Sequence, residues 1–327
     1  MRLKTILIAG AAVAVLAGTA HAEDKTLAIV VKGLDNPFFE QINLGCQKWN
    51  SENAARGYKC YYTGPASSTD EVGEVQIVED LLNRPDVKAI AISPSNAPLM
   101  AKLLREKAPG IPIMTIDADL SADDAALRKT YLGTDNYQMG VKFAEHLKAL
   151  KPEGGTVCLQ LGNVAADNIN QRAAGTRDTL SGEKGVDRLT GQGGWTEIAG
   201  CPVFTNDQAD LANQQMADTF VANPNLTAFM LIGGWAQFAP QAYAQVTDQV
   251  MGKLKDKSLV IVAGDTLPPQ MEALKAGRSH VQVGQRPFEM GYRAPDVMSD
   301  LLDGKTVDPI IVTGLDECTQ ETAATCI

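Results

Sequence analysis

The sequence predicts an α/β fold in which parallel strands are buried between layers of helices. The first observation is that short apolar runs, of strand length, alternate along the chain with longer segments in which apolar residues recur with the helical period. The second is that the connections are short and contain neither a long linker nor low-complexity sequence. Because a regular succession of strand, helix and strand requires crossover connections, the strands are expected to run parallel.

The predicted elements form two series, one before Asp135 and one after Gly154, without a clear sequence repeat between them. In chain order, the expected strands are Leu27–Val31, Tyr58–Thr63, Val87–Ser93, Ile111–Asp117, Thr130–Gly133, Thr156–Leu161, Trp195–Ala199, Leu226–Gly233, Ser258–Gly264 and His280–Gln285. The helices expected between them include Asp70–Arg84, Ala97–Lys107, Asn136–Leu150, Leu211–Ala222 and Pro268–Ala276.

Residues 27–40 indicate how such a sheet would present a ligand site. Their apolar run predicts a buried strand, and Asn36 and Pro37 are residue types preferred at the cap and first turn of a helix. Phe38 and Phe39 follow at the edge where open α/β sheets bind ligands. Both rings could instead belong to the core. Adjacent helical positions point about 100° apart, however, so they cannot face one core equally well.

Residues 1–22 have the three features of a secretory signal peptide. Arg2 and Lys4 form a basic start, residues 6–16 are apolar, and Ala20-His21-Ala22 matches a cleavage site. The apolar run is too short to remain as a membrane anchor. Thr19 stands where a lipoprotein would carry its lipidated cysteine. We therefore expect a mature chain of 305 residues that carries no lipid anchor and is located in the periplasm.

The composition argues against several classes of partner and site. The formal net charge is −10, whereas nucleic acids and anionic membranes bind to basic patches. Once the signal peptide is removed, His146 and His280 are the remaining histidines, which argues against a histidine-based zinc site or a Ser-His-Asp triad. Neither common glycine-rich phosphate-binding motif occurs. No metal and no cofactor are therefore expected.

The six cysteines all lie in the exported part of the chain, and an even number in an oxidising compartment predicts disulfides. Six cysteines allow 15 pairings, and no C-x-x-C motif is present. Because neighbours in one lobe or in the tail are the simplest partners, we predict the pairs Cys46–Cys60, Cys158–Cys201 and Cys318–Cys326. The alternative is that the thiols are free and buried.

Polar and aromatic residues follow several of the apolar strands, at the edge where the ends of parallel strands meet. Carboxylates and amides bond to hydroxyls, and aromatic faces pack on sugar C–H groups, so this set predicts a cleft for a neutral polyhydroxy ligand. A single aspartate could instead cap the next helix, which is the alternative for Asp135 and Asp265. The residues that follow the strands are Asp117, Asp135-Asn136, Gly233-Gly234-Trp235, Asp265 and Gln285-Arg286.

Several motifs occur in a characteristic order along the chain. They are Asn36-Pro37-Phe38-Phe39, Thr115-Ile116-Asp117, Gly133-Thr134-Asp135-Asn136, Ile261-Val262-Ala263-Gly264-Asp265 and Val283-Gly284-Gln285-Arg286-Pro287. In this order, and over residues 26–315, the chain resembles the ribose-type sugar-binding proteins. These are substrate-binding components of ABC sugar importers, and they share their fold with the ligand domains of LacI-like repressors.

The resemblance implies two Rossmann-like lobes joined by three hinge crossovers, with a ligand cleft between the lobes. The crossovers are expected near Gly133–Asp135, Gln285–Arg286 and Val307–Ile310. One lobe would then contain residues 23–133 and 286–308, and the other residues 134–285 and 309–327.

The resemblance also implies a set of ligand contacts: an amide, a stacked phenyl ring, two carboxylate acceptors, a guanidinium of the second lobe and an amide of a hinge strand. In this chain the first amide belongs to Asn36 and the phenyl ring to Phe38 or Phe39. The two carboxylates belong to Asp117 and Asp265. The guanidinium belongs to Arg172 and the amide of the hinge strand to Gln285.

Two positions depart from the family pattern. Ala118 follows Asp117 where the family often has arginine, and Gly233-Gly234-Trp235 stands where an Asn-Asp pair is common. The two glycines would let the backbone turn sharply and bring the Trp235 indole to the cleft as an apolar wall. The alternative is a core tryptophan. If the indole faces the ligand, that ligand should have fewer hydroxyls or more C–H surface on this side than ribose.

These inferences predict a periplasmic protein that binds a monosaccharide or sugar alcohol by closure of its lobes. It would act as a monomer and deliver its ligand to permease subunits of an ABC importer in the inner membrane. One alternative is a sensor that passes a sugar or a furanosyl autoinducer to a membrane receptor. Another is an exported sugar hydrolase or isomerase, but no activated nucleophile or acid–base pair is recognisable, so no enzymatic activity is expected. The export signal and the absence of an N-terminal helix-turn-helix exclude a repressor.

Overall fold

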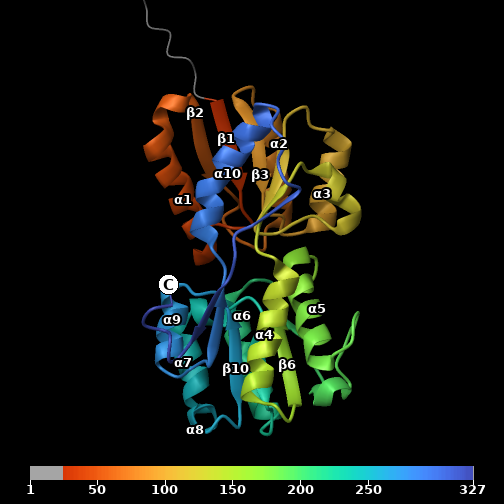
Figure 1. Ribbon diagram of the computed structural model, residues 1–327, viewed down its shortest axis with the longest axis vertical. Coiled ribbons are helices and arrows are strands. Elements are labelled where there is room, and N and C mark those ends of the chain that lie inside the picture. The colour runs from red at the N-terminus through yellow and green to blue at the C-terminus, as the bar shows by residue number, and fades with distance from the viewer. Residues whose placement is uncertain (1–24, 327) are drawn as a thin grey trace, which may run out of the picture.

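Two sheets, each flanked by helices, make up the computed structural model, which describes residues 25–326 (Figure 1). The predicted α/β class with mainly parallel strands is confirmed. The expected signal peptide, residues 1–22, lies outside the described residues. No helix within residues 25–326 is long and apolar enough to cross a membrane.

The first sheet has six parallel strands in the order β12-β5-β4-β3-β1-β2. They are β1 (Lys25–Val30), β2 (Tyr58–Thr63), β3 (Val87–Ile92), β4 (Ile113–Ile116), β5 (Tyr131–Gly133) and β12 (Ile310–Val312). The accompanying helices are α1 (Pro37–Asn53), η1 (Ala54–Arg56), α2 (Glu71–Leu82), α3 (Ala97–Lys107), η2 (Ala122–Leu127) and α10 (Pro287–Leu302).

Both faces of the first sheet are covered, because successive residues of a strand point to opposite sides. Leu27 and Ile29 of β1 pack with α1 and α10, which lie side by side in Figure 1. Ala28 and Val30 pack with α2 and α3 on the other face. This is why the strand has an uninterrupted apolar sequence.

The second sheet has the order β13-β11-β10-β9-β6-β7, with β8 paired to β6 and with β13 antiparallel. Its strands are β6 (Gly155–Leu161), β7 (Trp195–Glu197), β8 (Val203–Phe204), β9 (Ala228–Leu231), β10 (Val260–Gly264), β11 (Val281–Gly284) and β13 (Asp316–Thr319). The accompanying helices are α4 (Asn136–Leu150), α5 (Asp167–Ser181), η3 (Gln192–Gly194), α6 (Ala209–Ala222), η4 (Trp235–Phe238), α7 (Pro240–Asp248), α8 (Met251–Lys255) and α9 (Pro268–Lys275).

The chain passes three times between the two sheets. It leaves the first sheet after β5, returns after β11 to form α10, and leaves again after β12. The third crossing differs from the expectation, because residues 310–312 still pair with β5. The crossing therefore lies at residues 313–315, and the boundary expected at residue 309 was too early. β12 has only three residues, two of them outward-facing and exposed, so no periodic apolar run marked it.

Three disulfides join the cysteines in the predicted local pairs. Cys46–Cys60 connects α1 to β2, Cys158–Cys201 connects β6 to the segment before β8, and Cys318–Cys326 closes the C-terminal tail. Among residues 25–326 no cysteine is free. Each pair lies within one lobe, so none of these bonds joins the two lobes.

Candidate ligand-binding cleft

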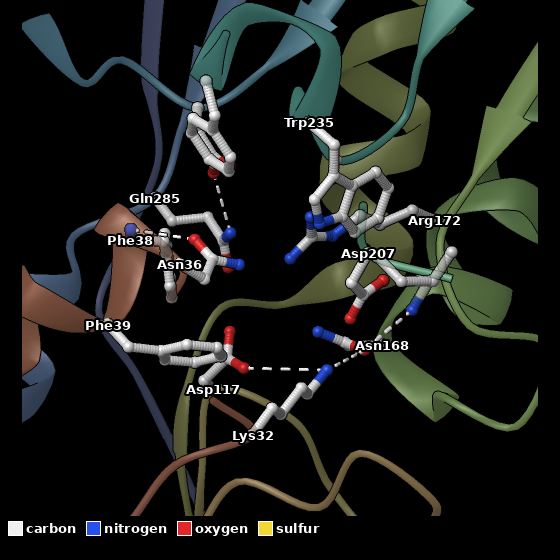
Figure 2. A pocket seen from close by; sticks show the side chains of 14 residues that line it. Lys32, Asn36, Phe38, Phe39, Asp117, Asn168, Arg172, Asp207, Trp235 and Gln285 are labelled. Atoms are coloured by element: carbon white, nitrogen blue, oxygen red, sulfur yellow. Dashed lines mark hydrogen bonds and ion pairs between the residues drawn. The ribbon is translucent and has the colours of Figure 1, made fainter. Parts of the chain in front are cut away.

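A small cavity lies between the lobes, where the carboxyl ends of strands from both sheets meet (Figure 2). All the residues expected to contact a ligand line it: Asn36, Phe38, Phe39, Asp117, Arg172, Trp235, Asp265 and Gln285. It is also lined by Lys32, Asn168, Ile169, Asp207, Gly233 and Phe238.

The start of α1 forms the aromatic wall of the first lobe. Asn36 caps the helix, since its Oδ1 accepts a hydrogen bond of 2.9 Å from the backbone N–H of Phe38. This leaves the Asn36 Nδ2 group to donate into the cavity. Phe38 and Phe39 meet edge to face, with ring centroids 5.3 Å apart. Both rings belong to the core of the first lobe and also line the cavity, so the core and cleft interpretations both hold.

Asp117 directly follows β4 and has a backbone φ of 64°. Such a conformation costs a residue other than glycine about 1–3 kcal/mol, and the surrounding structure has to hold it. Tyr131 Oη donates to the backbone oxygen of Asp117 at 2.9 Å, and Ser93 Oγ donates to Asp117 Oδ2 at 2.7 Å. Asp117 Oδ1 is left to accept a hydrogen bond from a ligand hydroxyl.

Lys32 and Asn168 join the two lobes beside Asp117. Lys32 Nζ donates to Asn168 Oδ1 at 3.2 Å and lies 3.9 Å from Asp117 Oδ2. A second contact across the lobes runs from Asn163 Nδ2 to Glu71 Oε1. Sequence reasoning missed Lys32 and Asn168. A lysine that directly follows a five-residue apolar strand was the available signal for the first. The second lies in α5, whose polar sequence was not predicted as a helix.

Arg172 reaches the cavity from α5 and is 2% exposed. Its Nε donates to Asn136 Oδ1 at 2.8 Å, and Nη1 donates to the backbone oxygen of Ile232 at 3.3 Å. Nη2 is buried and has no hydrogen-bond partner within the described residues. A buried N–H group without a partner is costly, and a ligand oxygen in the cavity would satisfy it.

Gln285 links two of the crossings to the carboxylate of the second lobe. It accepts a hydrogen bond of 2.9 Å from Thr134 Oγ1 and donates one of 2.8 Å to Asp265 Oδ1. Asp265 directly follows β10, has a φ of 70°, and does not cap α9, since the cap position is Leu267. The helix-cap alternative is therefore wrong for Asp265. It holds for Asp135, whose Oδ1 accepts from the backbone N–H of Gln138.

Burial raises the pKa of the Asp265 carboxyl to about 6, partly offset by Arg172 and by the hydrogen bond from Gln285. The folded state therefore binds this proton more tightly than the unfolded chain does. As a result, the contribution of Asp265 to the free energy of unfolding decreases as the pH rises from about 4 to about 6, and it stays low above that range. Two pH units correspond to about 3 kcal/mol.

Replacement of Asp265 by asparagine should therefore stabilise the unliganded protein while it weakens ligand binding. We expect the free energy of unfolding at pH 7.5 to rise by about 1–3 kcal/mol, with little change near pH 4. Affinity should fall about tenfold, because a charged acceptor is lost. Denaturant titration and calorimetry would measure both effects. Asp135→Asn is the matched control, since asparagine caps a helix as well as aspartate does. Unchanged affinity in Asp265→Asn would contradict the assignment.

Trp235 and Asp207 form the outer part of the second-lobe wall. Trp235 is 5% exposed, belongs to the core of its lobe and lines the cavity, so again both interpretations hold. A Cβ atom on Gly233 would overlap the six-membered ring of the indole, so glycine is required there. Asp207 was not predicted, because the strand before it, β8, has only two residues. Burial raises the pKa of its carboxyl.

A family model described as a periplasmic binding protein domain matches residues 27–306. The chain belongs to this family. The expected family resemblance is thereby confirmed. Among curated relatives, the D-allose-binding periplasmic protein of Escherichia coli is 24% identical over 310 residues, with 92% of each chain covered. The ribose import binding protein RbsB of Escherichia coli is 24% identical over 314 residues, with 94% of each chain covered.

Solved structures of ABC transporter solute-binding proteins have the same fold. One from Agrobacterium vitis, with bound D-fucose, has a TM-score of 0.79 and 22% identity, and the match covers 92% of this chain and 97% of that chain. Another from Burkholderia graminis, in complex with D-arabinose, has a TM-score of 0.76 and 28% identity, covering 93% and 98%. The chain therefore shares the two-lobed fold of these solute-binding proteins.

Proposed function

We propose that this protein captures a monosaccharide or sugar alcohol between its lobes and delivers it to an ABC importer in the inner membrane. The observation that carries the proposal is the convergence of unused hydrogen-bonding groups on one buried cavity. Arg172 Nη2 and Asn36 Nδ2 can donate there, and Asp117 Oδ1 can accept. Aromatic rings from both lobes supply the apolar walls. A ligand with several hydroxyls and C–H faces would satisfy both kinds of group.

Capture would occur by closure of the lobes about the three crossing segments, a movement for which periplasmic binding proteins are a standard example. We propose that the first lobe comprises residues 23–133 and 286–312 and the second lobe residues 134–285 and 316–327. Lys32 and Asn168 would then separate on opening, because they lie in different lobes. The features of residues 1–22 support location in the periplasm, and the protein would act there as a monomer without catalysing a reaction.

A thermal-shift screen of residues 23–327 against monosaccharides, amino sugars and polyols tests binding. A ligand at a hundredfold excess over its Kd adds about 2.7 kcal/mol to the free energy of unfolding, which should raise Tm by roughly 4 °C. For delivery, cells without the gene should lose uptake of that ligand, and the unaltered gene should restore it. If no compound raises Tm, the proposed ligand class is wrong. If uptake continues without the gene, the protein binds its ligand for another purpose.

A further inference from the structure

Acidic groups outnumber basic groups among the side chains of the cavity. Lys32 and Arg172 are basic, whereas Asp117, Asp207 and Asp265 are acidic. Lys32 lies beside Asp117, and Asp265 accepts a hydrogen bond from the Gln285 amide. Within residues 25–326, no basic nitrogen lies within 4.0 Å of the Asp207 carboxylate. Asp207, like Asp265, therefore forms no ion pair, and the more distant charges of Lys32 and Arg172 only partly offset burial, which raises the pKa of its carboxyl.

The Asp207 carboxylate lies against the Trp235 indole. A Cβ atom on Gly162 would overlap both Asp207 Oδ1 and the six-membered ring of Trp235, so the two side chains meet over this glycine. Figure 2 shows them side by side on one wall of the cavity. Asp207 Oδ1 also accepts a hydrogen bond of 3.1 Å from the backbone N–H of Asn163, which holds the carboxylate in place. A fixed carboxylate beside an aromatic ring is a combination that attracts cations.

A second hollow adjoins the cavity at the same point. Its lining shares Asn36, Asp207 and Phe238 with the cavity and contains no lysine, arginine or histidine. Its other lining residues are Asp35, Pro37, Ser67, Ser68, Thr69, Gln208, Ala209 and Asp210. The approach to Asp207 from this side is therefore also acidic and hydroxyl-rich, which disfavours an anionic ligand.

We propose that the ligand carries a protonated amino group, which binds to the Asp207 carboxylate beside the Trp235 ring. The ligand class is then an amino sugar or an amino-substituted cyclitol rather than a neutral sugar. The inference rests on the proposed function and narrows it. Arg172, whose buried Nη2 has no partner in the described chain, would bind a hydroxyl of the same molecule. An ammonium group would form an ion pair with the partly buried Asp207 carboxylate, whereas a hydroxyl would leave it without one.

Matched ligand pairs test the inference. Calorimetry would compare D-glucosamine with D-glucose, D-galactosamine with D-galactose, and 3-amino-3-deoxy-D-ribose with D-ribose, with N-acetyl-D-glucosamine as an uncharged amine derivative. At pH 7.5 the amino sugar of at least one pair should bind ten or more times as tightly as its hydroxyl counterpart. If in every pair the hydroxyl sugar binds equally well or better, the inference is wrong and the proposed function stands. If none of these sugars binds and no compound of the thermal-shift screen raises Tm, both are wrong.

The Asp207→Asn variant tests whether the preference for the amino sugar depends on this carboxylate. Asparagine retains an oxygen to accept the Asn163 N–H, so the fold should be preserved, as the Tm without ligand would verify. The preference for the amino sugar should fall to less than threefold in this variant. Asp218→Asn is the matched control, because it removes the same charge from α6, outside the cavity lining. This variant should retain the full preference for the amino sugar. A preference that persists in Asp207→Asn would overturn the assignment to this carboxylate.

Discussion

Replacement of Trp235 by alanine is expected to weaken ligand binding at least about thirtyfold. The indole lines the cavity and is 5% exposed, and truncation of such a buried aromatic anchor typically costs 2 kcal/mol or more of binding free energy. Part of the loss arises because Asp207 would lose the ring beside it. Calorimetry with the ligand that the thermal-shift screen identifies would measure the change.

Tryptophan fluorescence gives a second readout of the same variant. The chain has three tryptophans, of which Trp49 and Trp195 are buried in the cores of the first and second lobes. Ligand addition should shift the emission of the parent and of Trp195→Phe, but should shift that of Trp235→Ala much less. Since Trp235 also packs in the core, some loss of stability is expected. Unchanged affinity together with a large loss of stability would assign the indole to the core alone.

Removal of the Cys158–Cys201 disulfide is expected to lower the free energy of unfolding by about 4 kcal/mol. The two cysteines are 43 residues apart. In the chain-entropy model, closing a loop of this length lowers the entropy of the unfolded chain and so raises the free energy of unfolding by that amount. The Cys158→Ala/Cys201→Ala double variant should therefore unfold at a lower denaturant concentration. Its ligand affinity should be unchanged, because neither residue lines the cavity.

The Cys318–Cys326 pair is the control for this effect. It is separated by 8 residues, so its removal should cost only about 2.5 kcal/mol in the same model. Denaturant titration of both double variants, with the parent measured under reducing conditions as well, would give the comparison. The expectation would be contradicted if the Cys158→Ala/Cys201→Ala variant lost less than about 1 kcal/mol of unfolding free energy. Free thiols at Cys158 and Cys201, found by non-reducing peptide mapping, would also contradict it.

The strand-end residues were predictable because their position depends on local sequence. Asp117 and Asp265 each follow an apolar run, and parallel strands end at one edge of a sheet. The same reasoning could not separate two aspartates with different roles. Asp135 caps α4, whereas Asp265 turns into the cavity with a positive φ. That conformation is held by contacts from elsewhere in the chain, which no local pattern reports.

Short elements and polar elements were the part of the fold that sequence reasoning missed. The two residues of β8 and the three of β12 are too few to show a period, and so the third crossing was placed too early and Asp207 was overlooked. The helix α5 is rich in polar side chains, and Arg172 was found there through the family resemblance alone. Asn168, four residues before it, was not found.

By itself, the sequence determined the α/β class, the local pairing of the cysteines and the polar residues at the strand ends. These follow from periodicity, strand length and neighbourhood, which act over a few residues. Only the tertiary structure decided which side chains meet across the cleft. Lys32 and Asn168 meet across the cleft although they are 136 positions apart, and within the second lobe Asp207 meets Trp235 over Gly162. Such contacts depend on how segments that are distant in the chain pack against each other, and no local interaction encodes that packing.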